Sequence, residues 1–171
     1  MDYMEIAILP KTSLRIKGKN ASFVVDPEDG SAYDAAFLLG KTQEQVKAGE
    51  AVVIDGPGEY EVGGVKMTGT RGDGSVFYSL KIDGIDLVFG TLSALDSMHQ
   101  KMKEHNIVVV FCDELKNSSF LTSLASNVII FYGEKAQEAA QTFGKETVNK
   151  TPKYTTTKDK LPQEVETVVL E

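Results

Sequence analysis

Histidine and cysteine, the residues most often used for metal sites and nucleophiles, are scarce in this 171-residue chain: it has His99, His105 and Cys112. One cysteine excludes an internal disulfide bond and fits a reducing compartment. The two histidines stand six positions apart on a predicted helix, so they point to different faces and cannot share a metal ion. We therefore expect two surface histidines, and a buried or edge thiol at Cys112 rather than a nucleophile.

Long apolar runs and basic clusters are also missing. No run of eighteen apolar residues occurs, and the N-terminal stretch MDYMEIAILPK has no basic segment and no apolar run long enough for a signal peptide. The net charge of −7 would repel a phosphate backbone. These absences predict a soluble, cytoplasmic protein that binds neither a membrane nor nucleic acid.

The composition is that of a globular protein, with 42% hydrophobic and 25% charged residues. The length suits one domain over residues 1–171 with a core of ordinary size.

The first half of the chain predicts short strands joined by tight turns. Gly63-Gly64 and Asp83-Gly84 have the chemistry of two-residue hairpins, and the glycine-rich segment 69–75 is interpreted as a hairpin loop rather than a phosphate-binding loop. Together these signals predict a meander of antiparallel strands. The expected strands include residues 4–9, 13–18, 21–26, 51–55, 75–84 and 85–90.

After Gly90 strands alternate with helices. Residues 93–106 have apolar positions at helical spacing, with Ser93 as a possible N-cap. This alternation predicts helices that cover a sheet. The expected order is a strand at 107–113, a short helical piece near 118–125, a strand at 127–133, a helix ending at Gly144 and a last strand at 167–171.

Three motifs, in this order, carry a family resemblance. The segment 13–27 (SLRIKGKNASFVVDP) is a hairpin ending in Asp-Pro, 52–69 contains Pro-Gly-Glu-Tyr-Glu-Val, and 75–92 is a strand pair. From about Met4 to Glu171 the chain resembles the metallo-β-lactamase-fold hydrolases, zinc-dependent members of the beta-lactamase superfamily. The resemblance implies an α/β (α+β) fold, an αββα sandwich of two mostly antiparallel or mixed sheets with outer helices.

The same resemblance shows which residues are missing. The family carries His-x-His-x-Asp-His after the strand that here is 35–40, but this chain continues with KTQEQV, including Lys41 and Gln43. Thr91 stands where the bridging aspartate is expected, and Phe131 or Tyr132 where a histidine is expected. The resemblance therefore implies a degenerate member with no metal ligands, no cofactor and no catalytic residue of the family type.

Three functions then compete. A non-catalytic binding or scaffold protein for an unknown small molecule or protein is the first expectation. The alternatives are a metal-independent enzyme using Lys41, Glu59 and Tyr60 in acid/base roles, and a hydrolase whose metal ligands lie elsewhere. The expected cleft contacts are Lys41, Gln43, Glu59, Tyr60, Thr91 and Tyr132.

Glu59 and Glu61 alternate along an extended segment, so both carboxylates face one side. This geometry suits either a cation site or a solvated strand face.

The apolar stretch 106–133 suggests a sheet left partly bare and a two-fold homodimer. The expected contact includes Leu121, Leu124 and Phe143; in the competing interpretation these residues pack inward as ordinary core.

Overall fold

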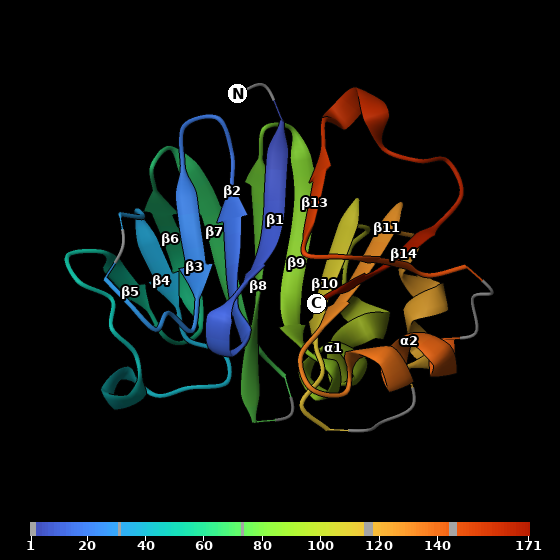
Figure 1. The fold of residues 1–171 in the computed structure, drawn as a ribbon, viewed down its shortest axis with the longest axis horizontal. Coiled ribbons are helices and arrows are strands. Elements are labelled where there is room, and N and C mark those ends of the chain that lie inside the picture. The colour runs from blue at the N-terminus through green and yellow to red at the C-terminus, as the bar shows by residue number, and fades with distance from the viewer. Residues whose placement is uncertain (1–2, 31, 73, 115–117, 144–146) are drawn as a thin grey trace.

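Two mixed β-sheets lie face to face in the computed structural model, which describes residues 3–30, 32–72, 74–114, 118–143 and 147–171 (Figure 1). The first sheet contains β1 (Met4–Leu9), β2 (Ser13–Lys17), β3 (Ser22–Val25), β4 (Ala35–Phe37), β5 (Val52–Ile54) and β13 (Lys153–Thr156). The second contains β6 (Gly58–Val62), β7 (Val65–Gly72), β8 (Ser75–Ile82), β9 (Ile85–Thr91), β10 (Ile107–Phe111), β11 (Val128–Tyr132), β12 (Asn149–Thr151) and β14 (Glu166–Leu170). The strand orders are β13-β1-β2-β3-β4-β5 and β12-β14-β11-β10-β9-β8-β7-β6.

The helical segments are short. They are α1 (Leu92–Met98), α2 (Ala136–Phe143) and the 3₁₀ turns η1 (Pro10–Thr12), η2 (Gln43–Gln45), η3 (His99–Lys101), η4 (Ser119–Leu124) and η5 (Lys158–Lys160). None of the helices in the described part of the chain is both long enough and apolar enough to cross a membrane.

The predicted hairpins form where the turn residues require them. Asp83 and Gly84 have φ values of 51° and 80° between β8 and β9, and Gly63 and Gly64 have 61° and 77° between β6 and β7. Positive φ at both central residues matches the right-handed twist of the flanking strands, which explains the glycines. The antiparallel meander β6-β7-β8-β9 is confirmed.

From β9 onward the second sheet is parallel, because helical crossovers join β9, β10, β11 and β14. A parallel strand is covered on both faces, and Val108 and Val109 of β10 are accordingly both fully buried, one on each face. The sandwich of two mixed sheets with helices outside is therefore confirmed.

The core between the sheets is organised around Phe37 of β4. Its ring meets Phe23 of the same sheet edge to face at 5.8 Å between ring centres. Across the sandwich it meets Tyr78 at 4.9 Å and Phe89 at 5.0 Å. Four buried aromatic rings thus join the first sheet to β8 and β9, an arrangement in which edge-to-face contacts add to the burial of apolar area.

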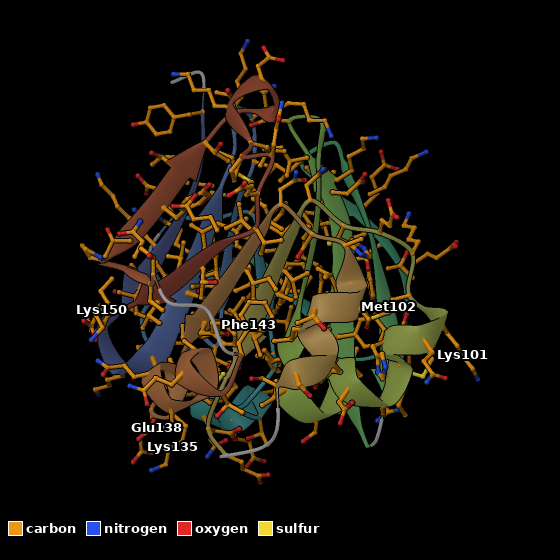
Figure 2. All side chains as sticks on the ribbon, turned by 90° about the vertical axis from the view of Figure 1, so that its right-hand side faces the viewer. Lys101, Met102, Lys135, Glu138, Phe143 and Lys150 are labelled. Carbon is orange, nitrogen blue, oxygen red and sulfur yellow. The ribbon has the colours of Figure 1, made fainter. Side chains whose placement is uncertain are left out.

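A second apolar cluster lies between the second sheet and the helices. Figure 2 shows the helical segments over the outer side of this sheet, with Phe143 within that layer and Lys135 and Glu138 at its rim. Leu121, Leu124 and Phe143 are buried in this cluster. The expectation that they form a dimer contact is therefore wrong, because their apolar side chains already pack against the sheet; the homodimer itself stays a prediction.

Two other local expectations need correction. The helix predicted over 93–106 ends at Met98, a 3₁₀ turn follows to Lys101, and Thr91 rather than Ser93 is the N-cap. The polar tail also contains two strands that the sequence did not predict, β12 and β13. They pair with β14 and β1, one in each sheet, and so tie the two sheets together near the C-terminus.

Replacing Phe37 by alanine should remove the aromatic contact between the sheets. We expect the free energy of unfolding to fall by about 3–5 kcal/mol, because a buried ring is lost and a cavity remains. Urea unfolding followed by circular dichroism measures the change. The control is Val52→Ala on edge strand β5, where the residue is 53% exposed and the change should stay within about 0.5 kcal/mol. Equal losses in the two variants would contradict this prediction.

Candidate functional site

Asp26, which follows β3, organises the loop at the ends of the strands. Its carboxylate accepts hydrogen bonds from the backbone N–H groups of Leu39 (2.9 Å), Gly40 (2.8 Å) and Lys41 (3.2 Å). Burial raises the pKa of Asp26, and the three hydrogen bonds oppose that shift because they favour the charged form. The family resemblance expects metal ligands in the segment after β4. In this chain the backbone N–H groups of that segment are bound to the Asp26 carboxylate instead.

The lysine in this segment is partly buried and paired with a carboxylate. Lys41 Nζ donates to Glu28 Oε1, and Lys11 approaches the same carboxylate at 3.4 Å. The hydrogen bond from Lys41 lowers the pKa of Glu28. The two side chains keep 25% and 31% of their surface exposed, so solvent weakens the pair and its contribution to stability is modest.

Aromatic rings fill the space behind the loop. Tyr132, on β11, is buried, its ring lies 5.2 Å from that of Phe111, and its hydroxyl has no hydrogen-bond partner among the described residues. Burial raises the pKa of Tyr132 well above its usual value, and the charge of Asp26 adds to the effect. A side chain at Gly40 would come within 2.9 Å of Phe111, so the loop and the ring are in close contact.

Three other candidate residues belong to no cluster of possible metal ligands among the described residues: Thr91, Gln43 and Cys112. Thr91 Oγ1 accepts the Ala94 N–H at 3.2 Å as the N-cap of α1 and lies 3.2 Å from Ser75 Oγ. Gln43 is exposed in η2. The thiol of Cys112 is fully buried and donates weakly to the Val110 carbonyl, and burial raises its pKa to about 12. Cys112 is thus the inert buried thiol that the sequence indicates.

The donors at the strand ends do not fit a zinc ion. Structural and catalytic zinc sites need three or four converging side chains, mostly imidazole, thiolate or carboxylate. Among the described residues no group of three or more histidine, cysteine, aspartate or glutamate side chains is placed to hold a metal ion. At the strand ends Asp26 is engaged by backbone N–H groups and Glu28 by two lysines.

Glu59 lies elsewhere, on the outer face of the second sheet. With Glu61, Lys66 and Ser79 it lines a cavity of about 740 Å³. Tyr60, on the same strand, also borders this cavity, while its side chain packs against the core between the sheets and its hydroxyl donates to the Gly56 carbonyl at 2.9 Å. The structure thus divides the expected cleft residues between the strand ends and this outer cavity.

His105 is the residue that sequence reasoning placed wrongly. It follows the helical turn instead of lying on it, and only 5% of it is exposed. Its Nε2 lies 3.1 Å from Ser79 Oγ, in the same outer cavity. The alternation of β8 puts Ser79 on the outer face, but no local signal placed His105 opposite it. The expectation of a surface histidine is therefore wrong for His105.

Solved structures show what the fold resembles. A Thermotoga maritima protein assigned to the zinc-dependent hydrolases of the metallo-beta-lactamase superfamily matches 98% of both chains, with a TM-score of 0.71 and 21% identity. The metallo-beta-lactamase fold protein YhfI of Bacillus subtilis matches 99% of this chain and 97% of its own, with a TM-score of 0.59 and 7% identity. At these identities the likeness establishes a metallo-β-lactamase-like fold. No protein-family model and no curated protein matches the chain.

Asp26→Asn should weaken the strand-end loop. An amide has one acceptor oxygen where the carboxylate has two, so at least one of the three backbone N–H groups loses its partner. We expect a loss of about 1–3 kcal/mol in the free energy of unfolding at pH 7. Urea titration measures it, with Asp159→Asn on the exposed turn η5 as the control of equal charge change. A loss no greater than that of the control would show that the loop does not depend on Asp26.

Proposed function

We propose that this chain is a metal-free relative of the metallo-β-lactamase-fold hydrolases, non-catalytic at the strand ends where the family places its metal site, and that it acts as a binding or scaffold protein in the cytoplasm. The observation that carries the proposal is that the polar side chains at the strand ends already bind other groups of the protein. The Asp26 carboxylate accepts hydrogen bonds from three backbone N–H groups, and Lys41 forms an ion pair with Glu28. The rings of Phe111 and Tyr132 lie behind the loop. A hydrolase of the family type needs open coordination positions there.

The proposed partner is a small molecule or a protein, bound outside the strand ends. The net charge of −7 disfavours nucleic acid, and a homodimer remains part of the proposal without an assigned surface. The alternative in which Lys41, Glu59 and Tyr60 share an acid/base site finds no support in their positions, because the first lies by Glu28 and the second in the outer cavity.

Elemental analysis after metal reconstitution tests the proposal. We expect fewer than about 0.1 equivalents of zinc, iron or manganese per chain after removal of free metal, because a ligand set is what gives a structural metal its affinity. Thermal unfolding with excess zinc gives a second readout: a metal that binds the native state would raise the melting temperature, and none should. One or two equivalents of tightly bound metal would overturn the proposal.

A further inference from the structure

Helices cover only part of the outer face of the second sheet. Phe77, toward one end of β8, belongs to the apolar cluster beneath α1, which Figure 1 shows at the same end of the molecule as α2. Two and four residues further along the same face of β8, Ser79 and Lys81 instead line the outer cavity. Its volume of about 740 Å³ falls in the range of small-molecule sites.

Ser79 and His105 form a hydrogen-bonded pair in this cavity. The distance of 3.1 Å between Ser79 Oγ and His105 Nε2 is within the reach of a nucleophile and its general base. His105 also makes a hydrogen bond with the backbone of Lys103, which favours the protonated ring because a carbonyl accepts from an imidazole N–H. In the neutral tautomer with the proton on Nδ1, Nε2 can accept the Ser79 hydroxyl proton.

The ring is kept neutral by its surroundings. Burial lowers the pKa of His105 from its ordinary value of 6.5, while Lys103 lowers it further and Asp86 opposes the shift. A neutral imidazole at pH 7 is the form that acts as a base.

Polar and charged residues of the neighbouring strands share this cavity. Thr68 lies directly opposite Ser79 across the β7–β8 ladder. On the same face, Lys66 lies opposite Glu61 and Lys81 lies opposite Asp86. Side chains directly opposite in an antiparallel pair have Cβ atoms roughly 5 Å apart. No ion pair within 4.0 Å occupies either lysine among the residues that the structure describes. Thr68 and the two lysines are donors that this cavity offers to an oxygen that becomes negative, and Glu61 and Asp86 share the same face.

We propose that Ser79 is a metal-independent nucleophile, with His105 as its base, that hydrolyses small acyl esters. Ser79 Oγ attacks the ester carbonyl carbon while its proton passes to His105 Nε2. The bond from that carbon to the alcohol oxygen breaks, and the departing alkoxide takes the proton. Water, deprotonated by the same Nε2, then attacks the acyl-serine and releases the carboxylic acid and free Ser79. This activity goes beyond the proposed function, which excludes catalysis of the family type at the strand ends, whereas Ser79 and His105 lie on the outer face of the second sheet and need no metal.

Covalent labelling of the full chain tests the nucleophile. A fluorophosphonate probe forms an oxygen–phosphorus bond with an activated serine and loses fluoride. We expect one adduct, located on Ser79 by peptide mass spectrometry, and none in Ser79→Ala. His105→Gln should slow labelling by about 100-fold or more. Release of p-nitrophenol from p-nitrophenyl acetate should fall in the same two variants.

Matched control variants distinguish a specific role of Ser79 and His105 from the effect of replacing any serine or histidine. His99→Gln and Ser123→Ala replace residues of the same types outside the cavity and should label Ser79 at the wild-type rate. If His105→Gln does not fold, the wild-type pH profile decides: the labelling rate should stay level from pH 8 to 7 and fall only below about pH 6.5, as the imidazole becomes protonated.

The labelling and the metal analysis fail independently. Treatment with a chelator should leave the Ser79 adduct unchanged, so bound metal would overturn the proposed function without touching this result. Absence of an adduct on Ser79 in the folded wild type between pH 5 and 8, or equal labelling in a folded His105→Gln variant, would overturn the inference.

Discussion

The Asp26 carboxylate is the interaction on which the strand-end half of the molecule depends. Asp26 has a φ of 51°, its N–H donates to the Phe37 carbonyl at 2.8 Å, and its own carbonyl accepts the Ser13 hydroxyl at 2.6 Å. Its carboxylate accepts hydrogen bonds from the backbone N–H groups after β4. Asp26 therefore connects β2, β3 and the loop beyond Phe37. Such a left-handed conformation is costly for a residue with a side chain, and the converging hydrogen bonds offset that cost.

The same hydrogen bonds explain why the residues at the strand ends stabilise the fold rather than form a metal or catalytic site. A metal site needs several converging side-chain ligands with free lone pairs, whereas the Asp26 carboxylate already accepts three backbone hydrogen bonds and lies by the packed rings of Phe111 and Tyr132. The Tyr132 hydroxyl has no hydrogen-bond partner among the described residues, but a single buried phenol makes no such ligand set. The residue types of a nucleophile and its base lie on the outer face of the second sheet instead. There Ser79 and His105 form a hydrogen-bonded pair in a cavity, which is the arrangement in which a serine hydroxyl is activated by a base.

The parts of the fold that local chemistry determines could be predicted from the sequence. Gly63-Gly64 and Asp83-Gly84 favour tight turns through their own backbone preferences, and the run 107–111 is short, apolar and rich in valine, as is typical of a buried strand. The strand β13 could not be predicted, because Lys153–Thr156 is polar and its place is given by pairing with β1 in the other half of the chain. Such pairing depends on contacts distant in sequence, where intrinsic strand preference is weak.

The candidate sites also divide into features that the local sequence shows and features that depend on contacts distant in sequence. That residues 41–46 lack histidine is visible in the sequence, but the burial of His105 is not, because it results from a helix that stops early. The apolar spacing over 93–106 continues past Met98, yet Asn106 must pair with β9 through Asp86 and with Asn127, which requires an extended chain before β10. Pairing with the sheet therefore overrides helix preference there and turns His105 inward against Ser79.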